Sequence, residues 1–220
     1  DPANVCMHEF WIDQSDFESY NLTSKGVIAI SLNELKSSYK SSSKTPTINI
    51  KIDEERTYTV DDGTPITRSL IDPDSVRRHP DIPDLDLCNE ISLPGEELQI
   101  LFKRLTSLGE HVLIESDEDA QETIFSVETS TDSLHKTYGD SKDLQSATAE
   151  NQAAFEMNVG KSGETLLSGD YIKDYLTSIR KKDLNDSYTI VSGHEFPIKL
   201  RTEFNDKSYS MFMLAPRIQA

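Results

Sequence analysis

The chain has 220 residues, 35% of them hydrophobic, which is enough to bury a core in one large domain or two small ones. Its 39 acidic residues outnumber its 22 basic residues and give a formal net charge of -17. Bulk charge therefore argues against a nucleic-acid-binding protein, which should carry the opposite sign. The argument weakens once position is considered, because many acids gather in short runs such as Asp53 to Glu55 and Glu115 to Asp119, while several bases cluster elsewhere.

The cysteine and hydropathy patterns argue against a disulfide-rich, a zinc-binding and a membrane-spanning protein. Cys6 and Cys88 have neither a CxxC spacing nor a paired-histidine pattern, which disfavours a disulfide framework and a zinc site. We find no basic start followed by an apolar stretch, and no apolar segment approaches the length of a membrane span. We expect a soluble, intracellular protein with two reduced thiols and no membrane partner.

The first half of the chain predicts a strand followed by a helix. Apolar and polar residues alternate from Gly26 to Ser31, as in a half-buried strand. Helical periodicity follows from Leu32 to Tyr39, with Lys36 and Lys40 on the polar side of the helix. The segment from Gly26 therefore reads as a strand that leads directly into an amphipathic helix.

A hairpin and then an extended strap follow that helix. Isoleucines alternate with polar residues from Thr47 to Ile52, and a charged turn leads to a second alternating run that includes Tyr58 and Val60. The segment Ile71 to Leu87 contains three prolines and five aspartates, which disfavour helix and ladder pairing. We place the domain boundary in this strap, between a first domain of residues 1–70 and a second domain of residues 88–220.

Two helices and several strands are expected in the second half. The first helix runs from Pro94, a favourable first-turn residue, to Gly109, and places Lys103 opposite its apolar stripe. The second runs from Ser168 to Ile179 and leads into three consecutive bases. The expected strands are Glu122 to Glu128, Ser187 to Ser192, Pro197 to Phe204 and Ser208 to Leu214.

The two halves show a similar order of elements. Val27 to Ser31 precedes the helix Leu32 to Tyr39 as Glu164 to Leu167 precedes the helix Ser168 to Ile179, and alternating strands follow each helix. The chain therefore reads as a diverged duplication of an α+β domain.

Four groups of segments carry a resemblance to a known family. They are DPANV at Asp1 to Val5 with FESY at Phe17 to Tyr20, LIDPDSVRRHPDIPDLDL at Leu70 to Leu87, LSGDYIKDYL at Leu167 to Leu176, and EFPIKL at Glu195 to Leu200 with MLAPRI at Met213 to Ile218. With these segments the chain resembles the archaeal and eukaryotic DNA sliding clamps, the proliferating cell nuclear antigen family, and the haloarchaeal members most closely. The resemblance implies two similar clamp domains, with antiparallel sheets outside and helices lining a ring.

The resemblance also shows a departure at the amino end. Family members begin with a strand, a helix and further strands ahead of the DPANV-like segment, whereas this sequence starts at Asp1 inside that pattern. We therefore expect an amino-terminally truncated first domain. An upstream start codon, a fragment, or a divergent viral or mobile-element copy would each explain it.

In the family ring the helix bases face duplex DNA and contact its phosphates without reading the bases. Carried over to this chain, the DNA-facing candidates are Lys36, Lys40, Lys103, Arg104, Lys173, Arg180, Lys181 and Lys182. Without the resemblance, a solvated helix face is the simpler interpretation. The resemblance reverses that preference for Lys103 and Lys173, and leaves both interpretations open for Lys181 and Lys182.

Family partners insert a short peptide with aliphatic and aromatic anchors into an apolar pocket under the strap. The corresponding residues here are Val5, Met7, Ile82, Pro83, Leu85, Pro197, Met213, Ala215 and Pro216, with Asn4 and Ile218 at the margin. Ordinary core packing is the alternative for Val5 and Met7, which alternate as in any strand. Ile82 and Leu85 stand in an acidic strap, where core packing explains them less well.

Subunits of the family join edge to edge, one strand of each extending the other's sheet. The resemblance places these strands at Ile66 to Leu70 and at Ser133 to Tyr138, with Leu134 among the contact residues.

The sequence offers little for catalysis. The segment GKSGET at Gly160 to Thr165 is similar to a phosphate-binding loop, but Phe155 stands where the earlier glycine is needed. The five histidines show no metal spacing and no obvious nucleophile partner. We expect no enzymatic activity, no metal and no cofactor.

These interpretations together predict a homotrimeric DNA polymerase processivity factor that is loaded by a clamp loader. It would hold a polymerase, a flap endonuclease or a ligase through a peptide motif, in the cytoplasm and associated with the nucleoid. One alternative is a truncated or viral clamp-like protein that binds partner peptides without closing on DNA. A more distant one is a hydrolase on a β-rich scaffold, which would require a buried polar cluster with perturbed titration.

Overall fold

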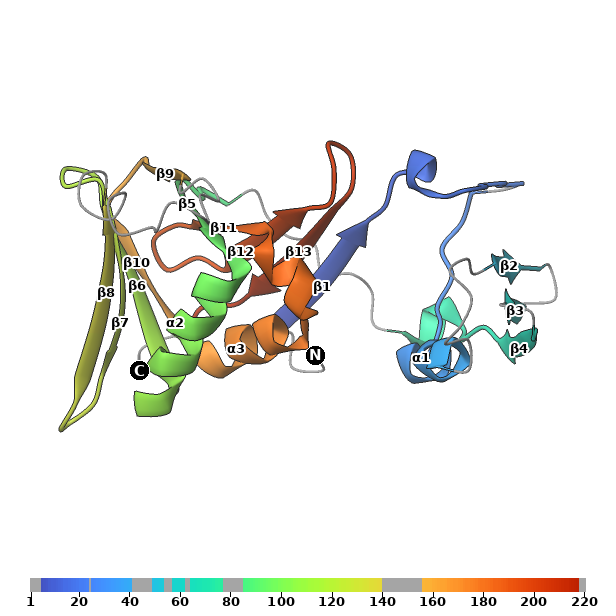
Figure 1. The fold of residues 1–220 in the computed structure, drawn as a ribbon, viewed down its shortest axis with the longest axis horizontal. Helices are drawn as coiled ribbons and strands as arrows, with labels where there is room; N and C mark the ends of the chain where they lie inside the picture. The colour runs from blue at the N-terminus through green and yellow to red at the C-terminus, as the bar shows by residue number, and fades with distance from the viewer. Residues whose placement is uncertain are drawn as a thin grey trace. The chain divides into compact units, whose positions relative to one another are not determined.

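The computed structural model describes residues 5–23, 25–40, 49–53, 57–61, 64–76, 85–139 and 156–217. The chain separates into two compact units (Figure 1). The larger unit consists of Asp1–Ser19 with Pro83–Ala220, and the smaller unit consists of Tyr20–Ile82. The elements of each unit are considered separately.

The larger unit contains two antiparallel sheets in its described part. The six-stranded sheet has the order β1 (Cys6–Trp11), β13 (Tyr209–Leu214), β12 (Ile198–Glu203), β11 (Ser187–Ser192), β5 (Asn89–Pro94) and β9 (Glu156–Val159). The four-stranded sheet has the order β10 (Gly163–Ser168), β6 (His111–Asp117), β7 (Glu122–Glu128) and β8 (Ser133–Gly139). Two helices, α2 (Gly95–Leu108) and α3 (Gly169–Ser178), and two short 3-10 turns, η1 (Gln14–Asp16) and η4 (Lys181–Asn185), are the other elements of its described part.

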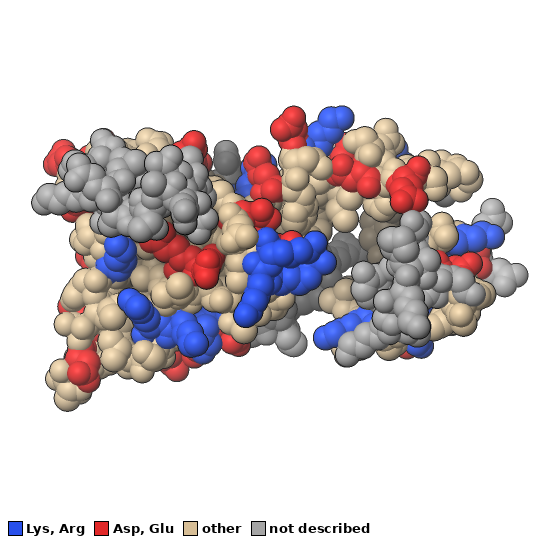
Figure 2. Space-filling model, in the orientation of Figure 1, with Lys and Arg blue, Asp and Glu red and all other residues tan. Residues whose placement is uncertain are grey.

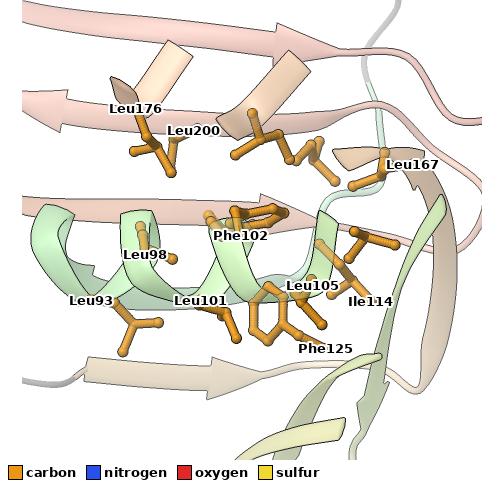
Figure 3. Close-up of a cluster of buried hydrophobic side chains, with 14 of the residues drawn as sticks. Leu93, Leu98, Leu101, Phe102, Leu105, Ile114, Phe125, Leu167, Leu176 and Leu200 are labelled. Carbon is orange, nitrogen blue, oxygen red and sulfur yellow. The ribbon is translucent and has the colours of Figure 1, made fainter. Parts of the chain in front are cut away.

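Helix α2 forms where the sequence predicts it, and its apolar stripe is the centre of the core. Leu98, Phe102 and Leu105 are fully buried, whereas Leu108 at the end of the predicted stripe is exposed. Glu96 and Glu97 in the first turn interact favourably with the positive end of the helix dipole. Figure 3 shows the α2 side chains among those of the surrounding strands and of α3.

Helix α3 lies against α2, and close backbone approach at Gly169 permits this packing. A Cβ built at Gly169 would lie 2.5 Å from Val112 Cγ2 and 2.9 Å from Thr106 Cγ2. The Gly169 amide donates to the Glu110 carbonyl at 2.8 Å, and the Gln99 side chain donates to the Leu176 carbonyl at 3.0 Å. Because both helices are held at their ends, their outward faces keep a fixed relation to each other.

An aromatic row joins α2 to the four-stranded sheet. The rings of Phe102 and Phe125 meet edge to face with centroids 6.0 Å apart, and those of Phe125 and Tyr138 do so at 5.8 Å. The buried Tyr138 hydroxyl donates to Glu97 Oε1 at 2.9 Å, which satisfies its only polar atom inside the core. Strand β8 is thereby fastened to the first turn of α2.

The smaller unit contains one helix and a three-stranded antiparallel sheet among its described residues. Its elements are α1 (Leu32–Lys40), β2 (Asn49–Ile52), β3 (Thr57–Asp61), β4 (Ile66–Ser69) and a 3-10 turn, η2 (Pro73–Ser75), with the sheet order β2-β3-β4. Ser31 caps α1 by accepting from the Glu34 amide at 3.4 Å. Arg68 on β4 donates to Ser38 Oγ at 2.9 Å and so ties the sheet to the helix.

The predicted hairpin and the three predicted helices are confirmed, but the predicted strand Gly26 to Ser31 is not. Only Ala29 pairs there, in an isolated bridge to Ile71, and Val27 is 85% exposed. Alternation specifies a strand only where a neighbouring strand completes its ladder. Strands β5, β6 and β9 were not predicted. Val112, Leu113 and Ile114 of β6 are consecutive apolar residues without alternation, and β5 runs directly into α2.

The contact units divide the chain differently from the predicted domains. Strand β1, which the sequence assigns to the first domain of residues 1–70, pairs with β13 in the larger unit, from Cys6 opposite Leu214 to Trp11 opposite Tyr209. Because the two units are defined by contacts, a strand that pairs with another domain is assigned to the unit of the strand with which it pairs. The boundaries 1–70, 71–87 and 88–220 therefore stay a prediction about the duplicated domains.

His8 lies at the seam between β1 and β13. Its Nε2 is 2.7 Å from Ser210 Oγ, and its ring contacts those of Phe10, Tyr175 and Phe212. Partial burial of the imidazole among these rings lowers the pKa of His8 below the ordinary value of 6.5, although part of the residue stays exposed to solvent. The folded chain therefore favours the neutral imidazole, whereas the unfolded chain takes up a proton as the pH falls through about 6.5.

We accordingly expect His8 to destabilise the folded state progressively as the pH falls below 6.5. The measurement is the thermal unfolding midpoint of the chain and of His8→Gln between pH 7.5 and 5. The midpoint of the wild-type chain should fall more steeply over this range. Equal slopes for wild type and His8→Gln would contradict the assignment.

Candidate functional site

The outward face of α2 presents two adjacent bases. Lys103 and Arg104 are exposed on the side of the helix opposite Leu98, Leu101 and Leu105, as the periodicity predicts for Lys103. Neither base has an ion pair with another residue in the part of the chain that the structure describes. Both charges are therefore available to an anion from solvent.

Lys173 occupies the corresponding outward position on α3, but its charge is shared. Its ammonium is hydrogen-bonded to Asp170 one turn earlier in the helix. That hydrogen bond raises the pKa of Lys173 above 10.5, and the charge of Asp174 contributes in the same direction. Lys173 is thus fully protonated at neutral pH yet already partly compensated, a feature that helical spacing alone does not show.

Further bases lie just after α3 and on α1. Arg180 donates through Nε to Asp183 Oδ2 at 2.7 Å, and Lys182 lies 4.0 Å from Asp183 Oδ1, whereas Lys181 has no such contact among the described residues. On α1 in the smaller unit, Lys36 is exposed, and the side chain of Lys40 lies outside the described set. Figure 2 shows Lys and Arg side chains gathered over α2 and over the segment that follows α3.

This arrangement suits a loose contact with a phosphate backbone. Lys103 and Arg104 are long, exposed side chains on α2, Lys181 is exposed on η4, and none of the three lines either of the two described pockets, where a base edge could be read. Exposed cations interact with phosphates mainly by releasing counterions, without sequence preference. The helix face therefore supports sequence-independent binding.

The second predicted site lies on the outer face of β1 and β13. Met7 stands opposite Met213, and the Ala215 amide donates to the Val5 carbonyl at 2.8 Å. The Met7 and Met213 side chains point away from the face that carries Leu214, which packs in the core. Val5 packs against the core, so ordinary core packing, the alternative to a role in the pocket, accounts for part of its contacts.

The strap end and the loop before β12 lie together because of Gly193. A Cβ at Gly193 would lie only 2.5 Å from the Asp86 carbonyl oxygen and 3.0 Å from Phe196 Cδ2. The glycine therefore allows Asp86, next to Leu85, to approach the loop that leads into Pro197. No sequence pattern predicted a role for Gly193, and Phe196 stood out only as part of the EFPIKL segment; the Ser-Gly turn before Pro197 was the available signal.

Seven of the nine predicted pocket residues lie in the described part of the larger unit. They are Val5, Met7, Leu85, Pro197, Met213, Ala215 and Pro216. Met213 is buried and the other six are half-buried. Ile82 and Pro83, like the marginal residues Asn4 and Ile218, lie outside the described residues. The pocket as a partner site stays a prediction.

Gly193→Ala is expected to destabilise the chain by about 1–3 kcal/mol, because the added methyl would overlap backbone that is already packed. The Asp86 carbonyl is part of the main chain and cannot rotate away as a side-chain end would. Urea denaturation measures the change. Gly26→Ala is the matched control, since nothing lies within 4 Å of its Cβ. A Gly193→Ala chain as stable as the control would show that the strap end moves freely.

The two strands predicted at the subunit interface each stand last in their described sheets. Strand β4 follows β3 in the three-stranded sheet, and β8 follows β7 in the four-stranded sheet. Ile66, Leu70 and Leu134 are half-buried, whereas the Tyr138 side chain is inside the core. Tyr138 could therefore contribute to an interface only through its backbone groups. The interface itself stays a prediction.

The described residues hold no group of three or more His, Cys, Asp or Glu side chains arranged to bind a metal ion. The loop Gly160 to Thr165 forms the β9–β10 turn and the start of β10, and the Gly160 amide donates to the Cys88 carbonyl at 3.1 Å. Its backbone is thus engaged within the fold. No helix in the described part of the chain is long and apolar enough to cross a membrane.

The chain is similar in sequence to DNA polymerase sliding clamps of haloarchaea. No protein-family model matches the chain. The DNA polymerase sliding clamp of Natronomonas pharaonis is 34% identical over 223 residues, which cover 100% of this chain and 84% of the relative. That of Haloarcula marismortui is 31% identical over 225 residues, with the same two coverages.

Solved structures are similar over the same extent. A structure described as the C-terminal region of FEN-1 bound to A. fulgidus PCNA matches with a TM-score of 0.82 and 24% identity, covering 100% of this chain and 84% of that one. PCNA from Thermococcus kodakaraensis matches with a TM-score of 0.80 and 18% identity, covering 99% and 84%. At these identities the structures establish the fold, and they confirm the predicted α+β architecture.

Proposed function

The chain belongs to the DNA polymerase sliding clamp family, and from this membership we propose that it is a processivity factor subunit that encircles duplex DNA and tethers replication and repair enzymes to it. The observation that carries the proposal is the similarity to haloarchaeal sliding clamps along the whole chain. The exposed bases on α2 agree with it.

The proposed contact with DNA is electrostatic and independent of sequence. Lys103 and Arg104 would face the phosphates, with Lys181 beside them, while Lys173 and Arg180 keep partial internal compensation from Asp170 and Asp183. Compensated bases bind phosphate weakly, which suits a protein that must move along the duplex. High salt would screen this contact further, so retention on DNA would depend on the closed ring.

The proposed partners bind through a short peptide at the β1–β13 face. The similar A. fulgidus protein is bound to the C-terminal region of FEN-1. For this chain we propose the same class of partner, a flap endonuclease, together with a DNA polymerase, a ligase and a clamp loader. The half-buried apolar residues of this face, with Met213 buried among them, provide the surface for aliphatic and aromatic anchors.

The proposed role is that of a scaffold, without enzymatic activity or a cofactor of its own. It implies a homotrimer joined by β4 of one subunit and β8 of the next. Both strands stand at a sheet edge, where backbone groups are ready to pair with another chain. The role also implies a cytoplasmic, nucleoid-associated protein.

The first test is the light-scattering mass of the purified chain in concentrated potassium chloride. A trimer mass is expected. A monomer at both physiological and high salt would contradict the ring and leave the rival proposal, a clamp-like protein that binds partner peptides without encircling DNA. Polymerase product length on primed DNA, with a clamp loader and with or without the chain, then tests the processivity role directly.

A further inference from the structure

The segment after β13 is held extended by contacts at both ends. The Ala215 amide donates to the Val5 carbonyl at 2.8 Å, and the Arg217 amide donates to the Leu166 carbonyl at 2.8 Å. Pro216 between them has no N–H to contribute, and it restricts Ala215 to an extended backbone. The segment therefore spans from β1 in one sheet to β10 in the other, and both available N–H groups are used.

The Arg217 side chain adds a third contact. Its Nη1 donates to Glu110 Oε1 at 2.7 Å, and it also contacts the His111 ring. Glu110 is itself fixed, because its carbonyl accepts from the Gly169 amide at 2.8 Å and its carboxylate lies 2.9 Å from His111 Nε2. The hydrogen bond from Arg217 lowers the pKa of the Glu110 carboxyl, so the ion pair persists to acidic pH.

We propose that Arg217, paired with Glu110, is a positioning residue for the partner-peptide site. It fastens the segment Ala215 to Arg217 so that Ala215 and Pro216 form a preformed wall beside Met213. This inference rests on the proposed function, since it concerns the same peptide site. Arg217 acts through the segment and does not contact the peptide.

The expected size of the effect follows from the population of the ordered segment. An exposed ion pair adds little to global stability, and Arg217 and Glu110 are 42% and 60% exposed. Removing it should leave the unfolding midpoint unchanged while the segment opens part of the time. The apparent dissociation constant rises by the inverse of the ordered fraction, and an exposed ion pair can change that fraction by no more than about 5-fold, so its removal should weaken peptide binding by about 2–5-fold.

The test is fluorescence anisotropy with a labelled synthetic peptide from the C-terminal region of A. fulgidus FEN-1, titrated with the full chain at low salt. Arg217→Gln and Glu110→Gln should each weaken binding by about 2–5-fold. Arg217→Lys, which keeps the charge, should restore most of the affinity, as should the charge-swapped double variant Glu110→Arg with Arg217→Glu. Lys207→Gln, which removes a more exposed cation near Asp13, should bind as wild type does.

The outcomes separate this inference from the proposed function. A wild-type chain that does not bind the peptide would overturn the peptide site and the inference with it. Wild-type binding that is unchanged in Arg217→Gln would overturn the positioning role alone. Weak binding by Arg217→Gln with normal binding by Glu110→Gln would assign Arg217 a direct contact and so contradict the proposal.

Discussion

Phe102→Ala should lower the free energy of unfolding of the chain by about 3–5 kcal/mol, the largest single-residue effect that we expect. Phe102 is fully buried at the centre of α2 and meets the Phe125 ring edge to face. Truncation would remove apolar contacts with both sheets and leave a cavity that the surrounding strands can only partly close.

Urea denaturation measures this loss, with far-UV circular dichroism and the fluorescence of Trp11, the single tryptophan, as probes. Ile100→Ala is the matched control, because Ile100 lies on the same helix but is 47% exposed. Its effect should be within about 1 kcal/mol. A Phe102→Ala chain no less stable than the control would mean that α2 does not anchor the core.

The second large effect concerns DNA. Replacing Lys103 and Arg104 together by glutamine should weaken binding to a short blunt duplex and reduce its dependence on salt. Each lost phosphate contact lowers the slope of log affinity against log salt concentration by about 0.9. Because neither base is paired with a described residue, their full charge is available to phosphates.

Fluorescence anisotropy of a labelled duplex over a series of potassium chloride concentrations gives the slope. Arg201→Gln serves as the control, since Arg201 pairs with Glu203 at 2.9 Å and lies on the outer face of β12. Its slope should match wild type. A double variant with the wild-type slope would place the DNA contact away from α2, whereas a stronger effect of Lys173→Gln would mean that Asp170 releases Lys173 on binding.

Local sequence patterns predicted most of the elements whose apolar residues recur with a clear helical or strand period. The apolar positions of α2 recur every three to four residues, so the buried Leu98 and the exposed Lys103 could both be assigned from the sequence. The same reasoning assigned too many residues to the buried faces of the helices, since Leu108 and Tyr171 are exposed. Periodicity gives the direction of a side chain but not whether a neighbour reaches it.

The candidate sites were predicted less completely. Helical spacing predicted that Lys173 points outward, but not that Asp170 neutralises part of its charge, because carboxylates one turn away choose among several rotamers. The pocket residues were predicted from the family resemblance and not from the periodicity of apolar residues. Neither pattern predicted a role for Gly193 or for Arg217, although Arg217 stands in the MLAPRI segment. Their roles depend on groups far away in the sequence, Asp86 for Gly193 and Glu110 for Arg217.

By itself the sequence determined the helices, several of the strands and the family, because these depend on short-range periodicity and on ordered motifs along one chain. The tertiary structure alone decided that β1 pairs with β13 some 200 residues later, that Gly26 to Ser31 stays almost unpaired, and that Tyr138 is buried. Strand partners are chosen by long-range packing and by closure of the whole sheet, and a local pattern of apolar and polar residues does not contain that information.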